Sequence, residues 1–445
     1  MRTIAIVGKP NVGKSSLFNK IIRRKQSIVN DEAGITRDRI YGLGNWLLRD
    51  FMLIDTGGLL SKTDDVYQAD IARQVNFAID EANTIIFLVS YKDGIDANDM
   101  MIAKMLKKTA SDKRVILAVN KVDNRNDNIN ENQLYALGFG KPIYISAEHS
   151  VGVGDLLDEL VVGLEPNNPN ENEDVFKFCV IGVPNVGKSS LLNAILNENR
   201  SIVHDQAGST RDSIDADFKY NKKSYTIIDT AGVRRKGKIS EDVEKYAVLR
   251  TQKAIARASL ILFMIDGSRD ITEQDEVVGG LAYQANIPTI IVVNKWDVVQ
   301  KDEKTMNQYI KKVRSHFKYL SWAPIVFISA KENKRIHTIF ETIDQVREQK
   351  DRRISTSVLT DTLVRANVAN DPAIHKGGRI IISYAVQVKS QIPTFVIKCN
   401  NPKFLHFSYA RYIENEIRLR FGFDLVPITL YWQDKNKRIR GLENE

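Results

Sequence analysis

Two short segments of this chain have the residue types and the spacing of a loop that cradles phosphate. Both follow the pattern Gly-x-x-x-x-Gly-Lys-Ser. Glycines in such a loop let backbone N–H groups turn toward phosphate oxygens, while the lysine reaches the β and γ phosphates and the serine can ligate Mg²⁺. The predicted phosphate-binding residues are Gly8, Lys9, Pro10, Asn11, Val12, Gly13, Lys14 and Ser15, and then Gly182, Val183, Pro184, Asn185, Val186, Gly187, Lys188 and Ser189.

Residues downstream of each loop can complete a magnesium site. The pattern Asp-x-x-Gly occurs at residues 55–58 and 229–232. Its aspartate would hold Mg²⁺ through the water shell, and the N–H of its last glycine would contact the γ-phosphate. Thr36 and Thr210 each lie 21 residues after the loop serine, where a threonine can close onto Mg²⁺ and the γ-phosphate while GTP is bound.

These patterns give three sets of expected roles. Magnesium ligands are expected at Ser15, Thr36, Asp55, Ser189, Thr210 and Asp229. Catalytic contributions are expected from Lys14, Thr36, Gly58, Lys188, Thr210 and Gly232. Further nucleotide contacts are expected from Thr56, Gly57, Thr230 and Ala231.

A further pattern selects the base. Asn-Lys-x-Asp occurs at residues 120–123 and 294–297, and Ser-Ala follows a later apolar run in each case. A carboxylate there can accept from both N1–H and N2–H₂ of guanine, a donor pair that adenine lacks, so we expect GTP to be preferred over ATP. The alanine N–H could bond guanine O6. The predicted base-binding residues are Asn120, Lys121, Asp123, Ser146, Ala147, Asn294, Lys295, Asp297, Ser329 and Ala330.

The loop, the Asp-x-x-Gly and the Asn-Lys-x-Asp patterns recur at an offset of 174 residues, which indicates a duplicated domain. In both copies, apolar runs rich in β-branched residues alternate with amphipathic segments such as Ser15–Arg23 and Ser189–Asn197. This alternation predicts a mainly parallel sheet with helices on both faces and with ligands at the carboxyl ends of the strands. The predicted strands are Thr3–Val7, Ile85–Val89, Val115–Val119, Pro142–Ile145, Phe178–Ile181, Leu260–Ile265, Thr289–Val293 and Ile325–Ile328.

The fold class is therefore α/β, with two GTPase domains of the phosphate-loop type at residues 1–164 and 175–350. Between them, residues 165–174 hold four acidic residues, two prolines and no large apolar side chain, which predicts a flexible linker. The repeat then stops, and residues 351–445 form a third domain. Its predicted elements are helix, strand, strand, helix and strand at Ser355–Asn367, Arg379–Val388, Thr394–Cys399, His406–Phe421 and Pro427–Gln433.

Composition narrows the class of protein and its partners. No apolar run approaches the roughly 20 residues that span a bilayer, and the N-terminus has no signal-peptide pattern, so we expect a cytoplasmic monomer without a membrane role. Cys179 and Cys399 lie far apart, and we expect two buried thiols and no disulfide. The formal net charge is +9, and residues 351–445 carry 15 Lys and Arg against 9 Asp and Glu. This excess fits either a polyanionic partner or a solvated surface.

With these motifs, the chain resembles the bacterial Der (EngA) family of tandem GTPases, of the TrmE/Era-like class. The resemblance covers the whole chain. GxPNVGKSSL and AGxTRD each occur twice, GVRRKGKI spans residues 232–239, and PTFVIKCNNP and HFSYARYIENEIR lie near the end. It implies GTP hydrolysis coupled to assembly of the large ribosomal subunit, GTP, GDP and Mg²⁺ as cofactors, and a KH-like α+β domain at residues 351–445.

The sequence gives no obvious device for activating water. Ras-like enzymes orient it with a glutamine directly after Asp-x-x-Gly, but here that position is Leu59 in the first copy and Val233 in the second. In related GTPases of this class an asparagine of the phosphate loop helps to bind K⁺, and the resemblance implies that role for Asn11 and Asn185. A K⁺ ion there would neutralise developing charge. The alternative is that the asparagine only shapes the loop.

Contacts to RNA have two candidate locations. The basic segment Arg234, Arg235, Lys236 and Lys238 directly follows the second Asp-x-x-Gly and could meet RNA or be a solvated loop. The C-terminal domain lacks the GxxG loop with which KH domains normally clamp RNA, although Arg411, Arg418 and Arg420 could form a phosphate-binding surface. We expect the aromatic residues Phe407, Tyr409 and Tyr412 to lie in the core.

Three functions remain open at this point. The first is a GTPase that acts in assembly of the large ribosomal subunit and binds that subunit or its rRNA. The second is an RNA-binding scaffold that is gated by GTP but hydrolyses little, which the missing glutamine favours. The third is a partner in RNA modification, which the likeness to TrmE suggests.

Overall fold

The computed structural model describes most of the chain. The described residues are 2–25, 41–47, 49–59, 67–110, 112–122, 131–164, 175–198, 215–228, 250–300, 302, 304–390 and 392–435. They form two compact units, one with the described residues up to 164 and one with those from 175 onward. Within these ranges no helix is long and apolar enough to cross a membrane.

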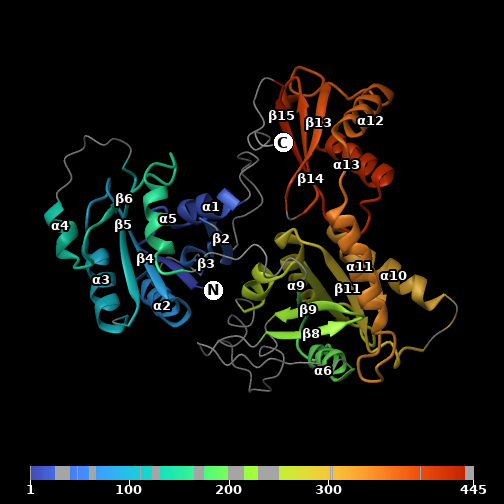
Figure 1. Ribbon diagram of the computed structural model, residues 1–445, viewed down its shortest axis with the longest axis horizontal. Coiled ribbons are helices and arrows are strands. Elements are labelled where there is room, and N and C mark those ends of the chain that lie inside the picture. Colours follow the sequence, from blue (N-terminus) through green and yellow to red (C-terminus); the bar gives the residue numbers. More distant parts are fainter. Residues whose placement is uncertain are drawn as a thin grey trace. The chain divides into compact units, whose positions relative to one another are not determined.

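The first unit is a six-stranded sheet with helices on both faces (Figure 1). The strand order is β2-β3-β1-β4-β5-β6, and every neighbouring pair is parallel except β2 with β3. The strands are β1 (Arg2–Val7), β2 (Tyr41–Trp46), β3 (Arg49–Asp55), β4 (Thr84–Ser90), β5 (Arg114–Asn120) and β6 (Ile143–Tyr144). The helices are α1 (Lys14–Lys25), η1 (Thr56–Leu59), α2 (Tyr67–Glu81), α3 (Ala97–Thr109), α4 (Glu131–Ala136) and α5 (Val153–Val161).

The second unit begins with a sheet of the same topology. Its strand order is β12-β11-β10-β7-β9-β8, and only the β8–β9 pair is antiparallel. The strands are β7 (Val175–Ile181), β8 (Ala216–Tyr220), β9 (Lys223–Ile228), β10 (Leu260–Asp266), β11 (Thr289–Asn294) and β12 (Ile325–Phe327). The helices are α6 (Lys188–Glu198), α9 (Glu273–Ala285), α10 (Thr305–His316), η2 (Lys318–Leu320) and α11 (His337–Asp351).

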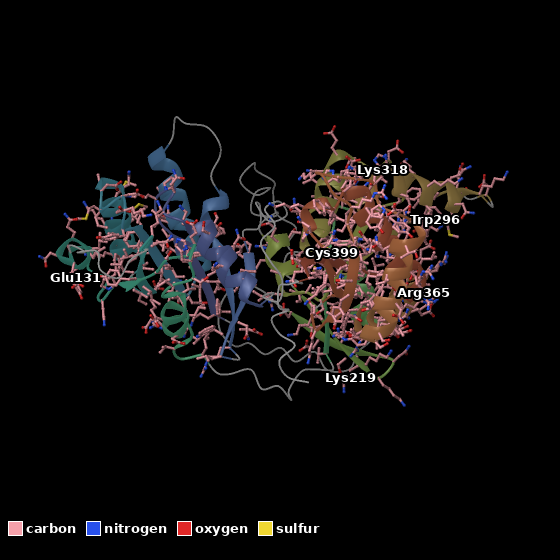
Figure 2. The ribbon with its side chains drawn as sticks, turned by 90° about the horizontal axis from the view of Figure 1, so that it is seen from above. Glu131, Lys219, Trp296, Lys318, Arg365 and Cys399 are labelled. Atoms are coloured by element: carbon pink, nitrogen blue, oxygen red, sulfur yellow. The ribbon has the colours of Figure 1, made fainter. Side chains whose placement is uncertain are left out.

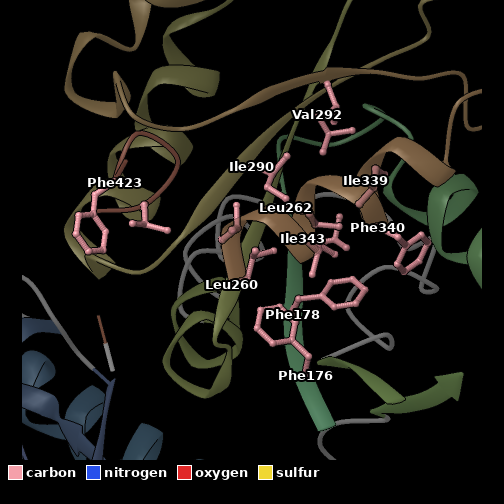
Figure 3. Packing of buried hydrophobic residues seen from close by; sticks show 14 of the residues in the cluster. Phe176, Phe178, Leu260, Leu262, Ile290, Val292, Ile339, Phe340, Ile343 and Phe423 are labelled. Atoms are coloured by element: carbon pink, nitrogen blue, oxygen red, sulfur yellow. The ribbon is translucent and has the colours of Figure 1, made fainter. Parts of the chain in front are cut away.

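Continuous apolar strands feed two cores, one on each face of this sheet. On β7, Phe178 and Val180 join a cluster that includes residues of α6 and α11, whereas Cys179 and Ile181 join a cluster that includes residues of α9 and α10. Alternation along a strand places successive side chains on opposite faces, so a strand buried on both faces must be apolar throughout. Figure 3 shows part of the first cluster, with Phe340 of α11 near Phe178.

The C-terminal part of the second unit forms a three-stranded sheet covered by two helices. β13 is antiparallel to β14, and β14 is parallel to β15. The elements are α12 (Thr356–Ala369), β13 (Ile382–Val388), β14 (Thr394–Cys399), η3 (Pro402–Phe404), α13 (Phe407–Phe421) and β15 (Thr429–Asp434). This order is the predicted one, but β13 begins three residues later than the predicted Arg379. Arg379 and Ile380 precede the strand, where the turn closed by the His375–Gly378 bridge leads into it.

Both cysteines are buried and free. Cys179 lies in β7, and Cys399 lies at the end of β14 (Figure 2). Burial raises the pKa of the Cys399 thiol to about 11, with a smaller contribution from Asp434. Because the thiolate is the reactive form, Cys399 is chemically inert at neutral pH.

Helix α11 joins the second nucleotide domain to the C-terminal domain through its last turn. Gln349, 9% exposed, donates from Nε2 to Asp424 Oδ1 at 2.5 Å and accepts at Oε1 from the Leu425 N–H at 2.8 Å. Arg352 Nη1 donates to the carbonyls of Phe421 and Gly422 at 2.7 and 3.0 Å. The residues that end α11 therefore also hold the segment that follows α13.

Replacing Gln349 with leucine should loosen this junction. The substitution leaves the Leu425 N–H and the Asp424 carboxylate without their partner, and an unsatisfied buried group costs about 1–3 kcal/mol. We expect the C-terminal domain to unfold at lower denaturant concentration, as followed by the fluorescence of Trp432 in a chain whose other tryptophans are replaced by phenylalanine. Gln345→Leu, the same substitution on an exposed position of α11, is the matched control. Equal stability of the two variants would contradict the proposed coupling.

Two candidate nucleotide sites

Each phosphate loop connects the first strand of its sheet to the first helix, and the two loops have the same backbone conformation. Asn11 and Asn185 have φ of 63° and 65°, and Gly13 and Gly187 have φ of 98° and 102°. Asparagine tolerates this left-handed region better than most residues. Glycine is required for a second reason, because a Cβ on Gly13 would lie 2.3 Å from Asn120 Nδ2.

The two loop lysines fold back onto their own loops. Lys14 Nζ donates to the carbonyls of Gly8 and Lys9 at 2.7 and 2.8 Å, and Lys188 Nζ donates to those of Gly182 and Val183 at 2.8 and 2.9 Å. Burial lowers the pKa of both lysines to about 8, although the charge of Asp55 acts against this at Lys14. An ammonium has three N–H donors, so two loop carbonyls can orient it while the third N–H meets a phosphate.

In the first domain, the Asp-x-x-Gly segment lies against the phosphate loop. Asp55 is the last residue of β3 and is 4% exposed, and its Oδ1 accepts from the Gly57 N–H at 2.9 Å. An ideal Cβ at Gly57 would lie 3.0 Å from Asp55 Oδ1 and 3.3 Å from both Ser15 Oγ and Lys14 Cε. A hydroxyl and a carboxylate oxygen thus border one small space beside the lysine. Oxygen donors of this kind fit Mg²⁺.

A buried asparagine braces each site from the side of the base. Asn120, 3% exposed, donates from Nδ2 to the carbonyl of Val12 at 2.8 Å and accepts at Oδ1 from the Ala147 N–H at 2.9 Å. In the second domain, Asn294 makes the same bonds to Val186 and Ala330, at 2.7 and 2.9 Å. One side chain therefore joins the phosphate loop to the Ser-Ala segment.

This brace differs from the expectation for the alanines. Sequence analysis reserves the N–H of Ala147 and Ala330 for guanine O6, but in the structure that N–H donates to the asparagine. Ser146 and Ser329 are almost fully buried and accept at Oγ from His149 and Glu332. The Ser-Ala residues thus shape the wall of the site in this conformation.

The lysines of Asn-Lys-x-Asp form ion pairs across the carboxyl edge of the sheet. Lys121 and Lys295 both have positive φ, 65° and 60°. Lys121 Nζ lies 3.1 Å from Asp93 Oδ2, and Lys295 Nζ lies 2.6 Å from Asp266 Oδ2. Asp297 follows in the second domain and is half-buried.

Several predicted residues lie outside the described part of the chain. Nothing is therefore concluded about the geometry of the switch threonines, of the first base-binding carboxylate or of the basic segment. These residues are Thr36, Asp123, Thr210, Asp229, Thr230, Ala231, Gly232, Arg234, Arg235, Lys236 and Lys238, and the predicted linker 165–174 lies outside it too.

Sequence analysis misassigned two side chains of the C-terminal domain. Tyr409 is buried as expected, but Phe407 is 66% exposed at the start of α13. Arg418 does not present its guanidinium as a phosphate-binding surface, because it is largely buried and bonds Glu414 and the carbonyls of Phe423 and Val426. Arg411 is exposed, with its guanidinium carbon 5.7 Å from the centre of the Phe407 ring.

Comparison with known proteins agrees with the duplicated site. Residues 3–121 and 177–295 each match a family model described as "50S ribosome-binding GTPase". Residues 353–433 match a model described as the C-terminal KH-domain-like region of EngA bacterial GTPase enzymes.

Full-length relatives are similar over nearly the whole chain. GTPase Der of Ureaplasma urealyticum is 69% identical over 442 residues, 99% of this chain and 100% of the relative. GTPase Der of Mycoplasmoides gallisepticum is 56% identical over 100% of this chain and 98% of the relative. GTPase Der of Staphylococcus carnosus is 47% identical over 97% of this chain and 99% of the relative.

Removing the brace should impair each site independently. Asn120→Ala leaves the Val12 carbonyl and the Ala147 N–H without their partner, a loss of about 1–3 kcal/mol for each group left buried. We expect guanine-nucleotide affinity to fall by at least tenfold, on the order of 1.4 kcal/mol, at the first site only. Asn294→Ala should do the same at the second.

The measurement is titration with a fluorescent guanine nucleotide, in which wild-type protein binds at two sites. Each variant should keep one site of unchanged affinity, so each serves as the other's control. Two unchanged sites in either variant would show that the asparagine is not what holds the loops together.

Proposed function

This chain belongs to the Der (EngA) family of tandem GTPases and hydrolyses GTP, and from that premise we propose that it is a nucleotide-switched factor in assembly of the large ribosomal subunit. The observation that carries the proposal is the pair of nucleotide domains, each matching a ribosome-binding GTPase model. We propose that the protein acts in the cytoplasm, as a monomer, with domains at residues 1–164, 175–350 and 351–445 and a linker at 165–174.

The proposed residue roles follow the geometry of the two sites. Lys14 and Lys188, held by two loop carbonyls each, orient the β and γ phosphates. The N–H groups of Gly58 and Gly232 contact the γ-phosphate, and Asp123 and Asp297 read guanine. The proposed Mg²⁺ ligands are Ser15, Thr36 and Asp55 in the first domain and Ser189, Thr210 and Asp229 in the second.

The path from the second nucleotide to the C-terminal domain is short in sequence. The Ser329-Ala330 segment, braced by Asn294, leads within eight residues into α11, which begins at His337. The end of α11 carries Gln349 and Arg352, which bond the segment after α13. We propose that the second site passes its nucleotide state to the C-terminal domain through this helix.

An aromatic and basic surface on the C-terminal domain suits unpaired RNA. The exposed Phe407 ring lies 4.4 Å from the His406 ring, which in turn lies 5.2 Å from the His375 ring. Arg411 lies over Phe407, and Lys403 is exposed nearby in η3. Bases stack on aromatic rings and on guanidinium planes, and phosphates attract the cations. We propose that this surface contacts rRNA in addition to the basic segment Arg234–Lys238.

Sedimentation with isolated ribosomal subunits tests the proposal. We expect the protein to pellet with the large subunit in the presence of a non-hydrolysable GTP analogue and to be released in GDP. Phe407→Ala should weaken this binding by about 5- to 100-fold, the effect of losing one stacked base at 1–3 kcal/mol. Leu419→Ala removes another exposed apolar side chain of the same helix, 83% exposed, and should have no effect.

Each result bears on a different part of the proposal. Binding to neither subunit in either nucleotide state would reject the ribosomal role and leave GTP hydrolysis in place. Binding to the large subunit that Phe407→Ala does not weaken would reject the aromatic surface alone.

We also propose that Asn11 and Asn185 bind K⁺ beside the phosphates. Their positive φ explains why asparagine suits the backbone, and both side chains are exposed, so the amide oxygen is accessible to an ion. A cation there would stabilise the charge that develops in the transition state, where no glutamine follows Asp-x-x-Gly.

Hydrolysis rates in K⁺ and Na⁺ at equal ionic strength test this role. We expect hydrolysis to be about tenfold faster or more in K⁺, in line with added electrostatic stabilisation of the transition state. Asn11→Gly with Asn185→Gly keeps a backbone that accepts positive φ and removes only the amide, so it should abolish the difference. Equal wild-type rates in the two salts would exclude K⁺ as a cofactor.

A further inference from the structure

The side chain of Lys9 leaves the first phosphate loop and does not point along it. Lys9 is the second residue of the loop and only 5% exposed. Its Nζ lies 2.9 Å from Asp96 Oδ2 and 2.8 Å from Asp99 Oδ2, and it donates to the carbonyl of Gly94 at 3.3 Å. A residue expected to bind nucleotide therefore spends its ammonium on the start of helix α3.

The two aspartates form a rigid receiving end. Asp96 is the N-cap of α3 and accepts from the N–H of Asn98 and Asp99, while Asp99 accepts from the N–H of Asp96. The Asp99 side chain is fully buried. Burial alone would lower the pKa of Lys9, but hydrogen bonds and charges from Asp99 and Asp96 raise it above its ordinary value. A capping box with a buried carboxylate fixes the position of any cation that neutralises it.

Lys9 touches the catalytic machinery through its backbone. Its carbonyl accepts one of the two hydrogen bonds that orient the Lys14 ammonium, at 2.8 Å. The same residue is thus attached to α3 by its side chain and to Lys14 by its main chain. Fixing the side chain limits how far that carbonyl can turn.

The second domain solves the same electrostatic problem without its phosphate loop. The residue that matches Lys9 is Val183, which is buried. Helix α9 also begins with a capping box, formed by Thr272 and the buried Asp275. There Arg269, from the loop that precedes α9, lies 3.0 Å from Asp275 and neutralises it. Neutralising the buried carboxylate therefore does not require a lysine in the loop.

We propose that Lys9 is a positioning residue of the first nucleotide site, which ties the phosphate loop to helix α3 and thereby orients Lys14. The second site has no such tie among the described residues. The affinity of the first site for nucleotide depends on the N-terminus of α3, and that of the second does not depend on α9 in this way. The inference rests on the proposed role of Lys14 at the phosphates.

Each site can be measured separately in the full chain. In a Lys188→Ala background a fluorescent guanine nucleotide reports the first site, and in a Lys14→Ala background it reports the second. Lys9→Met keeps the length of the side chain but removes its charge. We expect it to weaken the first site on the order of 5- to 100-fold, the usual range of coupling between sites, and to leave the second unchanged. Lys9→Arg should restore binding because it can reach both carboxylates.

A double variant separates positioning from simple neutralisation. Lys9→Met with Asp99→Asn removes both charges, so it should recover the melting temperature that Lys9→Met loses but not the nucleotide affinity. Recovery of both would overturn the proposal, as would equal loss at the two sites in Lys9→Met. If the chain with both Lys14→Ala and Lys188→Ala keeps first-site affinity, the role of Lys14 itself fails. Loss in that chain without loss in Lys9→Met rejects only the role of Lys9.

Discussion

The buried amide of one asparagine in each domain is the contact on which the nucleotide sites depend. Asn120 and Asn294 are each held between the phosphate loop and the Ser-Ala segment, and both ends of the amide are used. Aspartate could not donate to the Val12 carbonyl, and a longer glutamine would displace one of the two partners. The close approach of the amide also explains why Gly13 and Gly187 admit no Cβ. Phosphate and base regions are thereby set at a fixed distance.

Much of this arrangement could be predicted from the sequence because it is repeated. The offset of 174 residues identified both phosphate loops, and apolar runs located the central strands to within one or two residues at most ends. Side-chain partners were less accessible. Nothing in the Asn-Lys-x-Asp pattern says that Asn120 bonds the alanine N–H, because that alanine lies 27 residues further along and the pairing arises only when strands β5 and β6 are adjacent.

The exposure of Phe407 could not be predicted for a related reason. Helical periodicity placed Tyr409, Ile413 and Ile417 on one face, and these three are buried. Phe407 lies two residues before that series, on the first turn, where the face of the helix that meets the sheet has already turned away. Periodicity ranks faces of a helix, but it does not say how far along the helix the sheet extends. The edge-strand hairpins β2–β3 and β8–β9 were missed because their burial alternates and their runs of apolar residues are short.

The duplicated domains are equal in geometry and unequal in electrostatics. Their loops, braces and lysine contacts agree to within about 0.1 Å in hydrogen-bond length, since any shift there would misplace the phosphates. Away from the phosphates this constraint is weaker, and the copies neutralise the same buried aspartate from different places, with Lys9 in one and Arg269 in the other. A duplication can diverge in this way without losing either site. The outer helices can then respond to different neighbours, α3 through the phosphate loop of the first copy and α11 through the C-terminal domain attached to the second.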